Sequence, residues 1–248
     1  MTERVVIITG ASSGIGAALG ELLAKQGDSV VLVARRADAL KAVADRCGPK
    51  AFAIVADVTH RGEVKRVVAE SIKRFGHVDV LVNNVGQGIT RAPSQLTDSD
   101  IDDMMRTNVK SAVYGMQEIL PHFQSRGEGH VINISSMLGR MPFAVIRSAY
   151  TGAKHFLNAI TAMFRAEVQA THPNIQFSIV SPPVVHTDFG LHAMHGGPDS
   201  RQLPGGQEVD EVAKVIAGVI ASRRPDVYTR AGSKAAVSAY FEKTGEDP

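Results

Sequence analysis

The sequence has little that could stabilise a fold apart from a buried apolar core. It contains no tryptophan, one cysteine in 248 residues and only 5% aromatic residues. A single cysteine excludes an intrachain disulfide framework and a cysteine-rich zinc site, and it favours a reducing compartment. Hydrophobic residues at 44% and charged residues at 21% are typical of a globular domain. We therefore expect a cytoplasmic, soluble protein.

An excess of charge of one sign is also missing. Lysine and arginine number 27 against 25 acidic residues, a net charge of +2, and they are scattered along the chain. This distribution argues against a nucleic-acid-binding face. The chain has no run of about 18 apolar residues, so no membrane partner is expected. The apolar run Val5-Val6-Ile7-Ile8 lies so near the start that we expect no signal peptide.

Short apolar runs alternate with longer segments of helical periodicity. Continuous apolar runs are typical of strands covered on both faces. The expected strands are Arg4–Thr9, Ser29–Ala34, Ala51–Ala56, Val78–Val82, His130–Ser135, Ile175–Val180 and Val227–Arg230. The expected helices are Ile15–Gln26, Ala37–Cys47, Arg61–Phe75, Ser99–Phe123, Ala149–Gln169 and Glu208–Ser222. The alternation predicts one α/β domain over residues 1–248, and the long irregular segment 184–206 is predicted to be a substrate lid.

A glycine-rich turn follows the first expected strand and opens the first expected helix. Its sequence is Thr9-Gly10-Ala11-Ser12-Ser13-Gly14-Ile15-Gly16, with the spacing Gly-x-x-x-Gly-x-Gly. Glycine permits positive φ and close backbone approach, and a helix N-terminus offers unpaired N–H groups to an anion. The position after the first strand predicts a dinucleotide pyrophosphate site. Ser12 and Ser13 are expected to cap this turn.

The residue that contacts the adenosine ribose is expected about 20 residues after the turn. There the second expected strand ends in Arg35 and Arg36 instead of an acidic residue. A guanidinium can hold a 2′-phosphate through charge-assisted bonds worth about 1.5–3 kcal/mol. This predicts NADP(H) over NAD(H); in the alternative interpretation both arginines are solvated loop residues. Asp57, which ends the third strand, suits a hydrogen bond to the adenine amino group.

Polar side chains with acid–base potential follow other expected strands. Tyr150 and Lys154 stand four residues apart at the start of a helix, and hence on one face. Lowering a tyrosine pKa from 10 toward 7 takes about 4 kcal/mol, which an ammonium about 4 Å away could supply. Two expected strands end at the ligand-binding edge of the sheet in polar residues, Ser135-Ser136 and Asn83-Asn84-Val85-Gly86. Asn108 lies inside an expected helix, although asparagine has a low helix propensity.

In this order, the elements resemble those of the short-chain dehydrogenase/reductase family over nearly the whole chain. The matching elements are the turn Thr9–Gly16, Asn83–Gly86, Asn108, Ser136 and Tyr150-x-x-x-Lys154. The resemblance implies a Rossmann-type, doubly wound, seven-stranded parallel sheet with helices on both faces. It also implies an oxidoreductase that interconverts a carbonyl and a secondary alcohol, assembled as a homodimer or homotetramer, with a small-molecule substrate.

The resemblance further implies a role for each matching residue. Tyr150 would exchange a proton with the substrate oxygen, which Ser136 would polarise. Lys154 would lower the tyrosine pKa and hold the nicotinamide ribose, and Asn108 would anchor a water that links Lys154 to solvent. Thr187 would bind the nicotinamide carboxamide. The expected NADP(H)-binding residues are Gly10, Ser12, Ser13, Gly14, Ile15, Gly16, Arg35, Arg36, Asp57, Val58, Asn84, Gly86, Tyr150, Lys154, Pro182, Val185 and Thr187.

Two departures from the family pattern bear on turnover. Ser136 and Tyr150 are fourteen residues apart, where the family usually has thirteen, and the extra residue is expected within Met141–Arg147. Pro183 stands where the family usually has glycine, which removes an N–H and fixes φ. Two alternative functions stay open: a 3-oxoacyl-thioester reductase of fatty-acid synthesis, and a dinucleotide-binding regulator without turnover.

Apolar and histidine residues near the expected site have more than one interpretation. The apolar residues after Ser136 either line the pocket of a hydrophobic substrate or belong to the core; they are Met137, Leu138, Met141, Phe143 and Val145. His192 and His195 could share one face of a helical turn, but no carboxylate or cysteine completes a metal set, so no metal is expected.

Overall fold

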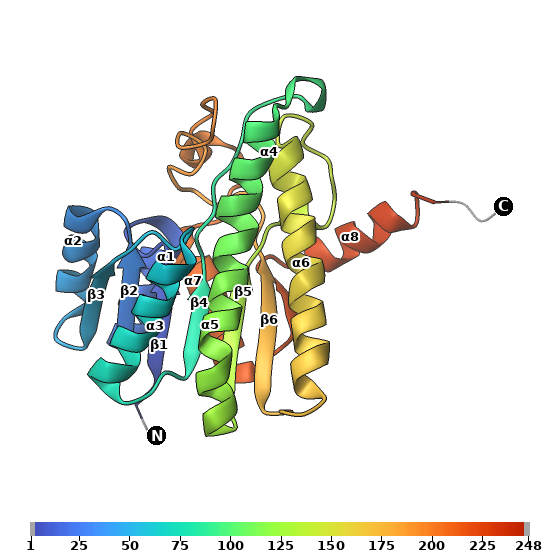
Figure 1. The fold of residues 1–248 in the computed structure, drawn as a ribbon. Helices are drawn as coiled ribbons and strands as arrows, with labels where there is room; N and C mark the ends of the chain where they lie inside the picture. Colours follow the sequence, from blue (N-terminus) through green and yellow to red (C-terminus); the bar gives the residue numbers. More distant parts are fainter. Residues whose placement is uncertain (1–2, 246–248) are drawn as a thin grey trace.

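The computed structural model describes residues 3–245. Its strands form one parallel sheet of seven, in the order β3-β2-β1-β4-β5-β6-β7 (Figure 1). The strands are β1 Val5–Thr9, β2 Ser29–Ala34, β3 Ala51–Val55, β4 Val80–Asn83, β5 Gly129–Ile134, β6 Ile175–Ser181 and β7 Asp226–Tyr228. The order reverses between β1 and β4, which confirms the predicted doubly wound α/β fold.

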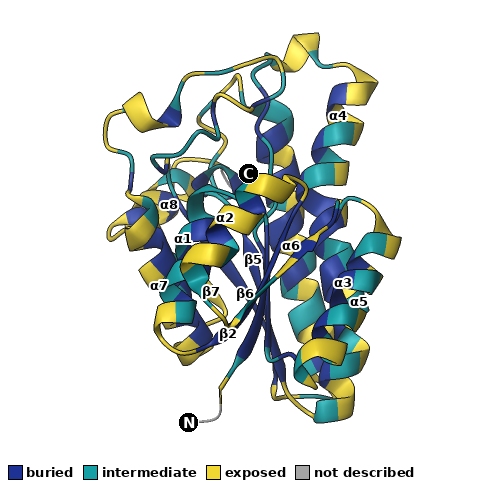
Figure 2. Ribbon diagram, turned by 90° about the vertical axis from the view of Figure 1, so that its left-hand side faces the viewer, coloured by how far each residue is buried: buried dark blue, intermediate teal, exposed yellow. Residues whose placement is uncertain are grey.

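Helices cover both faces of the sheet, and the alternation of strand side chains divides the core between them (Figure 2). The helices are α1 Gly14–Lys25, α2 Ala37–Cys47, α3 Arg61–Phe75, α4 Asp98–Met105, α5 Ser111–Arg126, α6 Ser148–Gln169, α7 Val209–Ser222 and α8 Ser233–Phe241. Ile8 of β1 packs in one cluster with Leu19 of α1 and Ile216 of α7. Its neighbour Ile7 packs on the opposite face with Phe123 of α5. Strands buried on both faces are what the continuous apolar runs predict.

The predicted single helix over residues 99–123 is wrong in its middle. A π-helical turn, Arg106–Lys110, separates α4 from α5. At its centre the Asn108 Nδ2 donates to the Met104 carbonyl at 3.1 Å and to the Gln87 carbonyl at 3.0 Å. A short amide side chain that donates to a backbone carbonyl competes with the regular backbone hydrogen bonds of the helix. Such π-helical turns often mark functional sites.

The chain beyond Gly232 differs from the sequence-based expectation. It forms helix α8, which projects from the body of the molecule in Figure 1. Only Ser233 and Val237 of this helix are buried, so its apolar periodicity is too weak to predict a helix. The segment 184–206 is irregular apart from the short 3₁₀ turn Ser200–Gln202. Among residues 3–245, no helix combines the length and apolarity that crossing a membrane requires.

Candidate functional site

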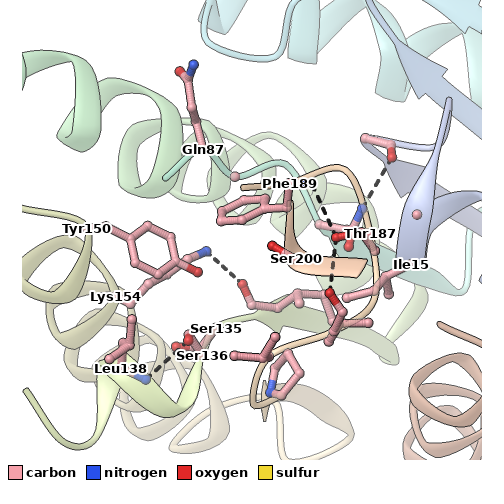
Figure 3. Close-up of a pocket in the computed structure, with 18 of the residues that line it drawn as sticks. Ile15, Gln87, Ser135, Ser136, Leu138, Tyr150, Lys154, Thr187, Phe189 and Ser200 are labelled. Atoms are coloured by element: carbon pink, nitrogen blue, oxygen red, sulfur yellow. Dashed lines mark hydrogen bonds between the residues drawn. The ribbon is translucent and has the colours of Figure 1, made fainter. Parts of the chain in front are cut away.

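A cavity of about 960 Å³ opens along the carboxyl ends of the strands. Parallel sheets bind ligands at this edge, where the strand order reverses. The predicted site residues that line it are Gly10, Ser12, Ser13, Gly14, Ile15, Arg35, Arg36, Asp57, Val58, Asn84, Gly86, Ser136, Tyr150, Lys154, Pro182, Val185 and Thr187. Gly16 and Asn108 lie behind this lining. Figure 3 shows Tyr150, Lys154 and Ser136 on one side and Ile15 and Thr187 on the other.

The glycine-rich turn has the close backbone packing that its sequence predicts. Gly10 and Gly14 have φ of 67° and 55°, a region that favours glycine. A Cβ on Gly16 would lie 2.5 Å from the Gly10 carbonyl oxygen, so only glycine fits there. Asn84 holds the turn from β4, because its Nδ2 donates to the Thr9 carbonyl at 3.1 Å. Helix α1 begins at Gly14, and its N-terminus faces the cavity, so the turn fits a pyrophosphate.

Ser12 and Ser13, which were expected to cap this turn, contact Arg36 with their hydroxyls. Ser13 is the N-cap residue of α1, but its side chain makes no capping hydrogen bond. Instead Arg36 Nη2 donates to the Ser13 Oγ at 2.7 Å and to the Ser12 Oγ at 3.2 Å. A charged guanidinium forms stronger hydrogen bonds with the two hydroxyls than a backbone N–H would. The guanidinium of Arg36 and the hydroxyls of Ser12 and Ser13 therefore lie together beside the turn.

The second arginine and the third-strand carboxylate lie next to this cluster. Arg35 is mostly exposed, and its Nη1 is 3.8 Å from Asp57 Oδ2. The other Asp57 oxygen, Oδ1, accepts from the backbone N–H of Thr59 at 3.0 Å. Asp57 is therefore fixed in place with one oxygen toward Arg35. With Arg35 and Arg36 against this single carboxylate, the end of the cavity beside the glycine-rich turn keeps a net positive charge.

Tyr150 and Lys154 are both buried on the cavity side of α6, with 8% and 3% of their surface exposed. The Lys154 Nζ donates to the Ile134 carbonyl at 2.9 Å and lies 5.7 Å from the centre of the Tyr150 ring. Burial lowers the pKa of Lys154 to about 8. Burial also raises the pKa of Tyr150 to about 12, against the opposing effects of the Ser136 hydroxyl and the Arg147 charge.

The expected lowering of the tyrosine pKa by Lys154 is therefore wrong for the protein alone. The ammonium is directed at a backbone carbonyl, and burial of the phenol outweighs the lowering of its pKa by the Ser136 hydroxyl and the Arg147 charge. Ser136 is in place beside the phenol, and its Oγ accepts from the Leu138 N–H at 3.1 Å. The three side chains named for the chemistry are thus brought together, with a fully protonated phenol.

Asn108 lies behind Lys154 and not in the cavity. It is fully buried in the π-helical turn, where its Oδ1 accepts from the Gln87 N–H at 3.0 Å. A Cβ on Gly86 would lie 3.1 Å from this oxygen and 3.4 Å from the Lys154 Nζ. The missing side chain at Gly86 therefore lets the amide and the ammonium approach each other.

The two departures from the family pattern both line the cavity. The connection from Ser136 to Tyr150 begins with the 3₁₀ turn Met137–Gly139 and continues as an irregular loop to Arg147. Within it Phe143 and Val145 are 64% and 67% exposed, so neither is a core residue. Met137, Leu138, Met141 and Phe143 line the cavity, as does Pro183.

Sequence reasoning missed one residue at the reactive end of the cavity, Arg147, which is the N-cap residue of α6 and lines the cavity. It belongs to no motif, so its position follows only from the fold. The ring of Phe189, from the segment 184–206, lies 5.8 Å from the Tyr150 ring. The two histidines face different partners: His192 Nδ1 is 3.6 Å from Asp188, and His195 Nε2 is 2.7 Å from Asp100. Residues 3–245 contain no cluster of three metal-binding side chains.

Comparison with known proteins agrees with this geometry. The model of the short chain dehydrogenase family matches residues 4–194. The chain belongs to this family of oxidoreductases. It is 35% identical over 191 residues to an uncharacterized oxidoreductase of Staphylococcus saprophyticus, which covers 77% of each chain.

Solved structures of the family share the fold. A short-chain dehydrogenase/reductase of Burkholderia phymatum in complex with NAD has a TM-score of 0.88 at 23% identity, covering 99% of this chain and 97% of the other. An alcohol dehydrogenase of the archaeon Thermococcus sibiricus, complexed with 5-hydroxy-NADP, has a TM-score of 0.78 at 25% identity, covering 91% and 95%. These two structures hold NAD and 5-hydroxy-NADP. The glycine-rich turn, the basic cluster of Arg35 and Arg36, and the cavity of this chain fit a nicotinamide dinucleotide.

Proposed function

We propose that the protein is an NADP(H)-dependent oxidoreductase that interconverts a carbonyl and a secondary alcohol. The observation that carries this proposal is the arrangement of two sites in one cavity. The glycine-rich turn and a basic cluster line one end, and Tyr150, Ser136 and Lys154 line the other. When bound, the nicotinamide would supply or accept the hydride. We also propose that the protein acts on a small-molecule substrate in the cytoplasm.

The basic cluster supports the choice of NADP(H). Arg36 and the hydroxyls of Ser12 and Ser13 already lie within hydrogen-bond distance of one another, so a 2′-phosphate would meet several donors at once. Arg35 adds a second guanidinium nearby. Asp57 is the acidic residue beside the cluster, and it faces Arg35. The positive charge of Arg35 therefore screens a 2′-phosphate from the negative charge of Asp57. The Thermococcus relative, whose structure holds 5-hydroxy-NADP, is consistent with this choice.

The reactive end supports proton transfer to or from a substrate oxygen. The Tyr150 phenol, protonated at neutral pH, would donate its proton to a carbonyl oxygen as the carbon is reduced. Ser136 would hydrogen-bond the same oxygen, and Lys154 would hold the cofactor ribose. We propose that Tyr150 is reprotonated from solvent by a relay along Lys154 and Asn108, which approach each other beside Gly86.

Two further expectations are part of the proposal. We propose that the segment 184–206 acts as a substrate lid, because Val184, Phe189 and Leu203 from it line the cavity. We also propose a homodimer or homotetramer assembled through α5 and α6. Phe156 and Met163 on α6 are 48% and 60% exposed, seven residues apart on one helix face.

A 3-oxoacyl-thioester reductase is the second candidate, and the loop before α6 favours it. Phe143 and Ile146 line the cavity and remain 64% and 46% exposed, so an acyl chain could lie against them. Acetoacetyl thioesters, tested beside simple ketones and sugars, distinguish this candidate from the first. The presence of Tyr150, Ser136 and Lys154 in one cavity argues against a regulator without turnover.

The decisive experiment replaces Tyr150 by Phe, which removes the proton donor and keeps the ring. Steady-state NADPH oxidation with a panel of ketones, aldehydes and acyl thioesters should fall by about 10²- to 10⁴-fold. NADPH affinity, measured by fluorescence titration, should change by only a few-fold. The matched control is Tyr114→Phe, a half-buried tyrosine of α5 that lies under Arg61 away from the cavity. Full turnover by the Tyr150→Phe variant would refute the mechanism.

A further inference from the structure

Arg147, at the reactive end of the cavity, has no acidic partner among the described residues. It is the N-cap residue of α6, three residues before Tyr150, and is half-buried in the cavity lining. Its only side-chain hydrogen bond within residues 3–245 runs from Nη1 to the Ile89 carbonyl at 3.1 Å. We propose that Arg147 binds a carboxylate of the substrate, so the preferred carbonyl compound is an oxo acid. This inference rests on the proposed function and specifies its substrate class.

Two neighbouring arginines, in contrast, do have acidic partners. Arg91 is 3.1 Å from a carboxylate oxygen of Asp100, and Arg140, at the start of the same loop, is 2.7 Å from Asp226. Arg147 makes no such pair with the described residues. Placing a guanidinium partly out of water without an anion costs free energy, which a bound carboxylate would recover. Burial accordingly lowers the pKa of Arg147 from its usual value.

The guanidinium is held in place from two sides. A Cβ on Gly88 would lie 3.1 Å from Arg147 Nη1, and a Cβ on Gly197 would lie 3.2 Å from Nη2. Both glycines therefore leave room for the planar group, and the bond to Ile89 fixes its orientation. Nε and Nη2 donate to no acceptor among the described residues, so both nitrogens keep N–H groups for a ligand that reaches them. Planar paired donors match the geometry of a carboxylate.

Two other charged side chains line this end of the cavity. Lys154 donates to the Ile134 carbonyl, and an Asp188 carboxylate oxygen lies 3.6 Å from Nδ1 of His192, which donates to the Asp188 carbonyl at 2.9 Å. The charge of Arg147 also acts on the phenol, because it lowers the pKa of Tyr150 against the larger effect of burial. Arg147 and Tyr150 are three residues apart at the start of α6 and both line the cavity, so one small molecule can contact both.

The rest of the cavity wall indicates what the carboxylate is attached to. The Phe189 ring packs 5.8 Å from Tyr150, and Met141, Phe143 and Ile146 line the mouth. Apolar walls with one fixed polar group are typical of sites that bind an aliphatic body in one orientation. The expected substrate is an aliphatic oxo acid whose carbonyl reaches Tyr150 while its carboxylate lies on Arg147.

The test compares straight-chain oxo acids with their methyl esters. The 2-, 3-, 4- and 5-oxo acids and the corresponding esters are assayed for NADPH oxidation with the natural protein and with Arg147→Met, Arg147→Lys and Arg140→Met. The natural protein should prefer at least one acid over its ester. In Arg147→Met the acid-to-ester ratio of kcat/KM should fall about 10- to 100-fold, the effect of a lost charge-assisted bond. Arg147→Lys should keep part of the preference, and Arg140→Met should keep all of it.

The ratio separates recognition from other roles of the same side chain. If Arg147 only fastened its loop or acted on Tyr150, acid and ester would lose activity equally and the ratio would stay constant, which would overturn the proposal. A natural protein that reduces neutral ketones but no oxo acid would overturn it as well and leave the proposed function standing. If no carbonyl is reduced, calorimetry with hexanoate decides, because binding that is lost in Arg147→Met supports the site and absence of binding to the natural protein refutes it.

Discussion

The stability of the fold should depend on pH through one histidine of the central sheet. His130 of β5 is fully buried, and its Nε2 lies 2.8 Å from the Ser178 Oγ. That hydroxyl donates to the Arg224 carbonyl at 2.7 Å, so the Nε2 must carry the proton of a neutral imidazole. The Nδ1 of His130 is also buried. Burial and the charge of Arg223 lower the pKa of His130 to about 3, against the opposing effect of a backbone hydrogen bond with Ile220.

The size and sign of the effect follow from this pKa. In the unfolded chain the imidazole has a pKa of about 6.5, so the difference is about 3.5 units, or about 5 kcal/mol at 1.36 kcal/mol per unit. Below pH 6.5 the unfolded state binds a proton that the folded state does not. The free energy of unfolding should therefore fall by about 1.4 kcal/mol per pH unit between pH 6.5 and 3, and His130 should contribute no pH dependence above that range.

Urea denaturation of the natural protein and of His130→Gln, from pH 7.5 to 4.5, tests this. The variant loses the titration and starts from a lower stability, because its amide fills the site less well. The difference between the two free energies of unfolding should shrink by about 1.4 kcal/mol per unit below pH 6.5. All other titrating groups are common to both proteins and cancel. Parallel curves over the whole range would show that His130 is not held neutral by burial.

Two further predictions concern the cofactor end of the cavity. Replacing Arg36 by Ala should weaken NADPH binding about 10- to 100-fold and NADH binding much less, measured by fluorescence titration; equal losses would remove Arg36 from the 2′-phosphate site. Replacing Gly16 by Ala should abolish cofactor binding, because the new Cβ would lie 2.5 Å from the Gly10 carbonyl oxygen. Its control, Gly218→Ala in α7, meets open space and should raise the free energy of unfolding by about 1 kcal/mol. Cofactor titration measures NADPH binding by the two glycine variants, and urea unfolding measures their stability. Tight binding by Gly16→Ala would contradict the packing argument.

Most of the fold could be predicted because the strands are buried on both faces. Runs such as 30–33 are apolar at every position, and such runs belong to parallel sheets. The interrupted helix at Asn108 could not be predicted, because the bonds that distort it come from Gln87 and Met104, one of them distant in sequence. Helix α8 was missed because only Ser233 and Val237 of it are buried, too few for an apolar period.

The candidate site was predicted as a set of residues but not as a set of contacts. Tyr150, Ser136 and Lys154 could be placed together because strand ends share one edge of the sheet. The partner of each side chain depends on packing that the sequence does not display. Lys154 was expected to act on Tyr150, but it donates to the Ile134 carbonyl. Arg36 was expected to bind a 2′-phosphate, and in the protein alone it donates to Ser12 and Ser13. Arg147 belongs to no motif and became visible only through its position.

The protonation of Tyr150 connects these observations to the direction of the reaction. Two positive groups, Lys154 and Arg147, lie near the phenol, yet burial dominates and raises its pKa to about 12. In the protein alone the phenol is thus a proton donor over the whole neutral range, which suits reduction of a carbonyl. Oxidation of an alcohol needs the phenolate, so any group that binds beside Tyr150 must first offset its desolvation. An anionic substrate on Arg147 would do the opposite, because it cancels the charge that lowers this pKa. Binding an oxo acid therefore strengthens the tendency toward reduction.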